Sequence, residues 1–196
     1  MKKIFAVIFA ALMIAALFLG ACEKKEEEVG EDIDTKAAVQ TIMENARAAA
    51  GEGAFIPMTL DLEVTADNCQ AYSGLSPEDF GEYVMEGYSM VAALNSQAFD
   101  LALIKCKDYA SAKEVKKLIA TGFNPAERIC AISEVAFVVD SGRFVLLGGV
   151  AADTAEAFQK AFADQFDTAA GEVNTFFERG ETDIDNGGFG GGLILD

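Results

Sequence analysis

Two short apolar runs on either side of a glycine turn restrict the fold of this chain more than any other feature. The runs cover 135–139 and 144–147, and the residues between them read Asp140-Ser-Gly-Arg143. Ser-Gly is a strong signal for a tight turn, and so short a turn connects neighbouring antiparallel strands. A similar pair of strands is predicted over 83–91 and 99–107. The sequence therefore predicts a sheet assembled from hairpins.

A further strand and three helices complete the main predicted elements. Residues 58–64 place an apolar side chain at every second position, which is typical of a strand with one buried and one solvated face. Apolar residues at helical spacing predict helices over 33–50, 109–121 and 153–169. The order of elements is then α-β-β-β-α-β-β-α.

This order predicts the fold class. Hairpins dominate and there is no regular βαβ alternation, so we expect an α+β fold with an antiparallel or mixed sheet of about five strands and helices packed on one face. Helix 109–121 has two candidate N-caps, Asp108 and Ser111. The stretch 72–82, rich in glycine and containing a proline, is predicted as loop, and 172–179 as one or two helical turns.

The N-terminal region combines a basic start with a long apolar run that ends near a cysteine. A short basic start, Met1 to Lys3, precedes 16 apolar residues, Ile4 to Leu19. As a helix this run would span only about 24 Å, less than the hydrocarbon core of a membrane, so it is typical of an export signal. Leu19-Gly20-Ala21-Cys22 resembles a lipobox, which implies cleavage before Cys22 and lipid attachment to the Cys22 sulfur.

Composition divides the rest of the chain. We predict a signal peptide over 1–21, an acidic tether over 22–35, an α+β domain over 36–170, and an acidic, glycine-rich tail over 171–196. The net charge is −17 and histidine is absent. The charge disfavours binding to nucleic acid, which needs a basic surface. The absence of histidine excludes nucleophilic Ser or Cys catalysis with a histidine base and also histidine-containing zinc sites.

Three cysteines remain besides Cys22. Cys106 shares a strand face with Ala102 and Ile104, which is typical of a small core residue. A Cys106–Cys130 disulfide is conceivable in an exported protein. Cys69, Cys106 and Cys130 match no metal motif and are odd in number, so we favour unpaired, buried thiols.

Lys105 and Lys107 are the most conspicuous polar residues of the predicted sheet. They would share one strand face, where Lys105 could contact an anion or act as a lysine of lowered pKa. We favour the simpler interpretation that both cover the solvated rim of the sheet.

Carboxylate pairs and a segment similar to a calcium-binding loop are weaker indications of a functional site. In a chain with 32 acidic residues, neighbouring carboxylates arise without function. The segment 183–188 has its asparagine one residue too early for an EF-hand loop, so we expect a flexible tail there. The pairs considered are Asp61/Glu63, Glu78/Asp79 and Glu82/Glu86.

Several segments follow one another in a distinctive order and spacing: LGAC, MTLDLEV, YSGLSPEDF, FDLALIKCKD with YASAKEVKKLI, and VAFVVDSGRFVLLGGVAAD. Together they resemble a family of small bacterial lipoproteins that carry one domain of unknown function and occur chiefly in anaerobic Gram-positive bacteria. The resemblance implies an anchored α+β domain but no catalytic residues and no ligand.

These observations favour a membrane-anchored, extracytoplasmic lipoprotein without enzymatic activity, cofactor or metal. It would be held at the cell membrane through Cys22 and would present a surface to an envelope protein or a cell-wall component. One alternative is a cell-envelope hydrolase that uses carboxylates or Lys105. Another is a small-ligand-binding module, which would need an apolar pocket.

Overall fold

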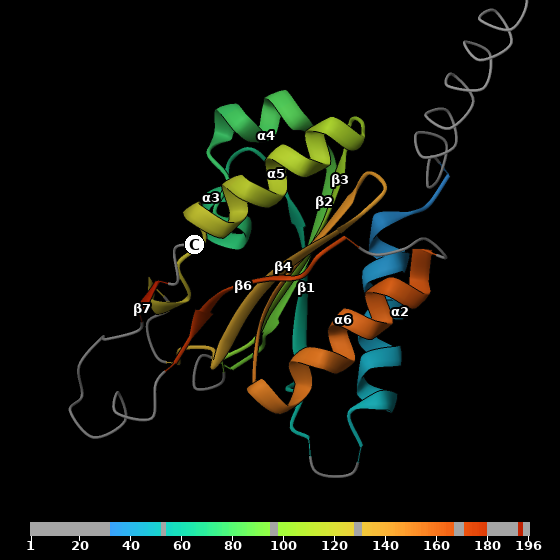
Figure 1. The fold of residues 1–196 in the computed structure, drawn as a ribbon, viewed down its shortest axis with the longest axis vertical. Helices are drawn as coiled ribbons and strands as arrows, with labels where there is room; N and C mark the ends of the chain where they lie inside the picture. Colours follow the sequence, from blue (N-terminus) through green and yellow to red (C-terminus); the bar gives the residue numbers. More distant parts are fainter. Residues whose placement is uncertain are drawn as a thin grey trace, which may run out of the picture.

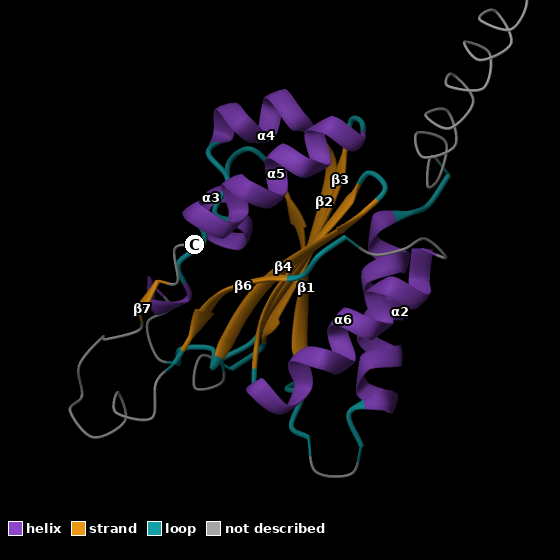
Figure 2. Ribbon diagram, viewed as in Figure 1, coloured by secondary structure: helices purple, strands orange, loops and turns teal. Residues whose placement is uncertain are grey.

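The computed structural model describes residues 32–51, 54–94, 98–127, 131–166, 171–179 and 192–193. These residues form one antiparallel sheet with helices on both of its sides (Figures 1 and 2). The strands are β1 (Thr59–Val64), β2 (Val84–Ala92), β3 (Asp100–Cys106), β4 (Val135–Ser141), β5 (Phe144–Val150), β6 (Asn174–Glu178) and the two-residue β7 (Gly192–Leu193).

The strand order is β1-β2-β3-β5-β4-β6, with β7 paired to β6. Neighbours along the sheet are antiparallel throughout. The α+β class and the hairpin construction are therefore confirmed, and the sheet contains β6 in addition to the five predicted strands. The predicted turn at Ser141 and Gly142 joins β4 to β5, and Gly142 has φ +57°, which glycine adopts without strain.

The helices cover both faces of the sheet, whereas the sequence predicted one. On one face, α2 and α6 pack against each other and on the sheet; on the other, α3, α4 and α5 lie together (Figure 1). We call these the α2–α6 face and the α5 face. The helices are α2 (Thr35–Ala49), α3 (Cys69–Ser73), α4 (Pro77–Tyr83), α5 (Tyr109–Gly122), the 3-10 turn η2 (Pro125–Glu127) and α6 (Ala152–Phe166).

The central strands show why both faces are covered. Every residue of β3 and β5 is buried, and their side chains alternate between the two cores. From β3, Leu101 and Leu103 join the core under α2 and α6, while Ala102 and Ile104 join the core under α5. Burial on both faces requires near-continuous apolar strands, and this composition was visible in the sequence.

The segment 72–82 forms helical turns, so its prediction as loop was wrong. Ser76 caps α4: its Oγ accepts a hydrogen bond from the Asp79 amide at 3.1 Å and donates one to the Asp79 carboxylate at 2.6 Å. Pro77 occupies the first turn of α4, where no intrahelical amide hydrogen bond is required. Of the two candidate caps of α5, Asp108 is the one used, since Oδ1 accepts from the Ser111 amide at 2.7 Å.

The prediction of helical turns over 172–179 was also wrong, because this segment contains strand β6. Phe176 and Phe177 are both buried beside α5, and Ala136 pairs with Phe177 in the register of β4 and β6. The sheet thus continues beyond residue 170, and part of the predicted tail belongs to the folded domain.

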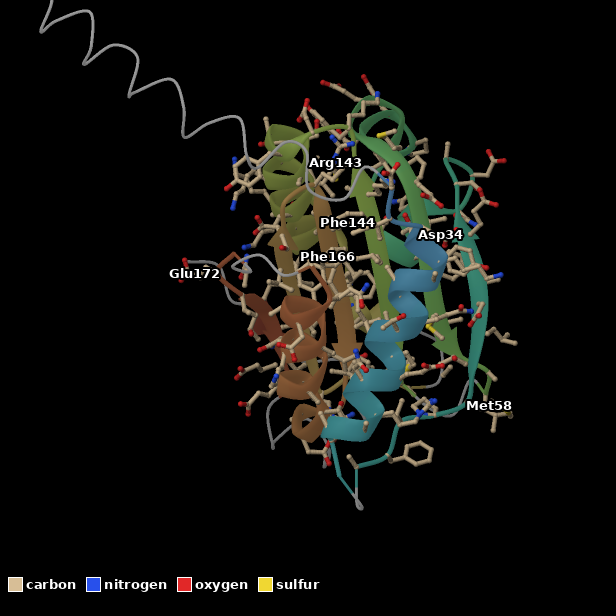
Figure 3. All side chains as sticks on the ribbon, turned by 90° about the vertical axis from the view of Figure 1, so that its right-hand side faces the viewer. Asp34, Met58, Arg143, Phe144, Phe166 and Glu172 are labelled. Atoms are coloured by element: carbon tan, nitrogen blue, oxygen red, sulfur yellow. The ribbon has the colours of Figure 1, made fainter. Side chains whose placement is uncertain are left out.

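Strand β1 runs antiparallel to helix α2. Gln40 of α2 donates to the Asp61 carboxylate at 2.9 Å, and Arg47, further along α2, donates to the Pro57 carbonyl at 3.4 Å. Asp34, the N-cap of α2, and Met58, just before β1, therefore lie at opposite ends of this helix–strand pair (Figure 3).

Candidate functional site

Strand β1 is an edge of the sheet, with a hydrogen-bonded neighbour only on the β2 side among the described residues. The Ala93 amide donates to the Met58 carbonyl at 2.8 Å. In an antiparallel pair such bonded positions recur at every second residue, so Leu60, Leu62 and Val64 direct their backbone groups to β2. Thr59, Asp61 and Glu63 direct theirs away from the sheet. We call this row, 59–63, the β1 edge.

An apolar row lies along the side of β1 that belongs to the α5 face. Val64 is buried under α3–α5, but Leu60 is 53% exposed and Met58, at the start of the row, is 74% exposed. The sequence predicted a buried apolar face here, and this was correct only at Val64. The helices of the α5 face pack over Val64 and leave the other end of the row exposed.

The opposite side of β1 carries Asp61 and Glu63, both exposed. Asp61 accepts a hydrogen bond from the neutral Gln40. Lys36 of α2 lies close enough to Asp61 to feel its charge: a hydrogen bond to Tyr88, and then the charges of Asp61 and Asp34, raise the pKa of Lys36, whose Nζ lies 5.3 Å from the Tyr88 ring centroid. Within the described ranges neither Asp61 nor Glu63 forms an ion pair, so these two carboxylates outnumber the one nearby lysine and this side of the edge carries net negative charge.

Asn68 marks the end of the available edge. Its Nδ2 donates to the Glu63 carbonyl at 3.0 Å, and its Oδ1 accepts from the Thr65 amide at 2.7 Å. One side chain thereby satisfies two backbone groups that a further strand would otherwise pair. The open part of the edge extends from Thr59 to the amide of Glu63.

Lys105 is buried, so its predicted place on a solvated rim was wrong. Its side chain lies on the α2–α6 face, where Nζ donates to the Ile33 carbonyl at 3.0 Å and stands 5.9 Å from the Phe144 ring centroid. Phe144 and Glu86 flank Lys105 on the two neighbouring strands. This lysine connects the start of the folded domain to the sheet.

Lys107 and the carboxylate pairs have local structural roles. Lys107 Nζ donates to the carbonyls of Gly81 and Glu82 at the end of α4, at 2.9 and 2.6 Å. Glu86 accepts from the Thr35 hydroxyl at 2.8 Å. Glu78 and Asp79 lie in the first turn of α4, where negative charge is favourable.

Asp140 is a buried carboxylate that the sequence analysis did not single out. Lys113 and Lys116 of α5 contact its two oxygens at 2.6 and 2.8 Å. Burial raises the pKa of Asp140, but the hydrogen bonds and charges of the two lysines outweigh this effect and hold the pKa below its usual value. The signal available in the sequence was an aspartate ending an apolar strand, with lysines at helical spacing on a neighbouring helix.

A backbone segment before β6 completes this cluster. The Gly171 amide donates to the Asp140 carbonyl at 2.7 Å, and Lys116 also donates to the Glu172 carbonyl. A Cβ on residue 171 would lie 2.4 Å from the Asp140 carboxylate. The cluster joins α5, β4 and the chain leading into β6, so we assign it a structural role.

Cys69 and Cys106 are buried and free, which confirms the prediction of unpaired, buried thiols at these two positions. Burial, followed by the nearby Asp108 charge, raises the pKa of Cys106 to about 12. Such a thiol is a poor nucleophile. Cys130 lies outside the described residues, as do Cys22, the leader and the calcium-like segment 183–188.

The described part of the chain contains no cluster of three or more Cys, Asp or Glu residues suited to a metal ion. In the same residues, no helix combines the length and hydropathy of a membrane span.

No protein-family model matches the chain. Searches of curated proteins and of solved structures likewise give no significant match. The family resemblance drawn from the sequence therefore stays a prediction.

Proposed function

We propose that this protein is a lipid-anchored component of the extracytoplasmic face of the cell membrane, and that its domain binds an envelope partner through the β1 edge without catalysing a reaction. The anchoring part of the proposal rests on the sequence Leu19-Gly20-Ala21-Cys22 after an apolar leader. The lipid would be attached to the sulfur of Cys22, and two or more acyl chains are needed for stable membrane binding.

The exposed row at the β1 edge is the observation that carries the binding part. Met58 is 74% exposed and Leu60 53%, and Phe55, shortly before the strand, is 62% exposed. An unpaired edge strand is a template for pairing with another chain, and exposed apolar residues beside it, here Met58 and Leu60 on one face, favour an interaction site there. A folded domain otherwise benefits from burying such side chains, by roughly 1.5–3 kcal/mol each.

Photo-crosslinking in intact cells tests the binding part. A photoreactive amino acid replaces Leu60 in one variant and Glu156, an exposed residue of α6, in a matched control. We expect discrete crosslinked products from position 60 and none of the same size from position 156. Equal patterns from both positions, or none from position 60, would refute a role for the β1 edge.

Fractionation tests the anchoring part separately. Cys22→Ser removes the sulfur that would receive the lipid, so the protein should leave the membrane fraction or accumulate as an unprocessed precursor. Unchanged processing together with unchanged membrane association would refute lipid anchoring at Cys22.

A further inference from the structure

We infer that the β1 edge accepts an extended segment of a partner protein in which basic and apolar side chains alternate. This inference rests on the proposed function and specifies the partner's chemistry. The segment would extend the sheet by one strand, as extended peptides do in other proteins that bind by strand addition.

The backbone of β1 supplies the first requirement. Thr59 and Asp61 present outward amide and carbonyl groups, and Glu63 presents its amide, while Asn68 occupies the Glu63 carbonyl. A partner strand would therefore pair along Thr59–Glu63 and stop there. This gives a short site with a fixed end, which sets the register of the added strand.

The side chains supply the second requirement. In paired strands, opposite residues lie on the same face of the sheet. A partner residue beside Leu60 or Leu62 would face the exposed apolar row, whereas one beside Asp61 or Glu63 would face two carboxylates. Apolar residues suit the first positions and lysine or arginine the second, so the partner segment must alternate.

The same charges argue against a second copy of this chain. Antiparallel self-pairing centred on Leu62 would set Asp61 beside Glu63 of the other copy, and pairing centred on Asp61 would set the two Asp61 side chains together. Pairing centred on Leu60 would set Asp61 beside Thr59, but the two Asp61 side chains would then be diagonal neighbours on the same face. Like charges directly opposite each other destabilise paired strands. The net charge of −17 adds long-range repulsion between copies.

Calorimetric titration of the full chain in detergent with synthetic peptides tests the inference. The probe is the heptapeptide Lys-Val-Lys-Val-Lys-Val-Lys, and the control has the same composition in block order, four lysines followed by three valines. A third peptide replaces every lysine of the probe by glutamate. We expect the probe to bind at least about tenfold more tightly than either control. Equal affinity of the two lysine peptides would overturn the inference, because it would show attraction by charge alone.

Two variants locate the binding. Asp61→Pro removes one outward amide together with the Asp61 carboxylate and leaves the β1–β2 hydrogen bonds in place, since proline is tolerated on edge strands; we expect at least about tenfold weaker binding of the probe. Asp61→Lys combined with Glu63→Lys should reverse the preference in favour of the glutamate peptide. Thermal unfolding checks that both variants fold.

Three further outcomes contradict the inference. Probe binding that Asp61→Pro leaves unchanged would place the peptide elsewhere. An unchanged preference in the double lysine variant would remove the role of the carboxylates. A dimer seen by sedimentation and abolished by Asp61→Pro would identify a second copy as the occupant. If position 60 still gives discrete crosslinks in cells while the probe fails, the proposed function stands and only the partner chemistry is wrong.

Discussion

Replacing Asp140 by asparagine should destabilise the domain far more than removing an exposed carboxylate. The side chain of Asp140 is 2% exposed, and its two oxygens lie 2.6 Å from Lys113 Nζ and 2.8 Å from Lys116 Nζ. Asparagine keeps the size of the side chain but removes the charge that both ammonium groups contact. The perturbation is therefore electrostatic and creates no cavity.

The magnitude follows from the exposure of the partners. Removing one member of a buried ion pair costs about 3–5 kcal/mol when the other stays buried. Here the Lys113 side chain is 41% exposed and that of Lys116 15%, so the lysines can recover part of their hydration. We expect a loss of about 2–3 kcal/mol in the free energy of unfolding, or roughly 4–12 °C in Tm for a chain of this size.

The pH dependence has a definite sign. Burial raises the pKa of Asp140, but the lysines outweigh it, so the pKa in the folded state lies below its usual value. A carboxyl group of this kind contributes its full stability above the unfolded-state pKa of about 3.9 and loses it as the pH falls through the folded-state pKa. The stability difference between the wild type and Asp140→Asn should be constant near neutral pH and should shrink below about pH 4.

Urea unfolding followed by circular dichroism measures both effects. The matched control is Asp164→Asn, which removes an exposed pair with Lys160 within α6 and should cost only about 0.3–0.5 kcal/mol. Equal losses for the two variants would refute the assignment of Asp140 as a structural centre. A difference that grows as the pH falls below 4 would refute the depressed pKa.

Three further predictions follow from buried or constrained positions. Burial raises the pKa of Cys106 to about 12. This thiol should therefore resist iodoacetamide at pH 8 in the folded protein and react in urea, as peptide mapping by mass spectrometry would show. Gly74→Ala should lower Tm much more than Gly51→Ala: both glycines have positive φ, which costs about 1–2 kcal/mol for alanine, but only at Gly74 would the Cβ meet backbone, at 2.2 Å. Lys105→Met should speed amide exchange around Ile33 several-fold, because the hydrogen bond to the Ile33 carbonyl is lost.

Each of these predictions has a clear contrary result. Rapid alkylation of folded Cys106 would mean that its strand opens on the time scale of labelling. Equal Tm values for the two glycine variants would mean that the neighbouring backbone moves aside. Unchanged exchange around Ile33 would mean that Lys105 does not hold this segment.

Local signals in the sequence predicted much of the sheet. The Ser141-Gly142 turn identified the β4–β5 hairpin, and the periodicity of α5 gave its position to within about one residue. These elements are determined by neighbours in sequence, so a single chain contains the necessary information. The continuous apolar composition of β3 and β5 also indicated that helices pack on both faces of the sheet, but this was not recognised.

The remaining features depend on contacts between distant segments. The role of Ser76 and Pro77 as a helix start was overlooked because proline and glycine also mark loops. Phe176 and Phe177 are consecutive, without the alternation of a strand; the register shift between β4 and β6 allows both to be buried. The exposure of Leu60 could not be read from the strand's own alternation, because it depends on where α3–α5 end on the sheet.

The antiparallel arrangement of α2 and β1 has a consequence for a protein attached to a membrane. Cys22 precedes Asp34 in the chain, and α2 leads from Asp34 to the end of the domain where Met58 directly precedes the β1 edge (Figure 3). The 15 residues of α2 correspond to about 22 Å. Under the proposed attachment at Cys22, the chain from the lipid would enter the domain beside Asp34, at the end of α2 opposite to Met58, so a partner could contact the exposed apolar residues without displacing the tether.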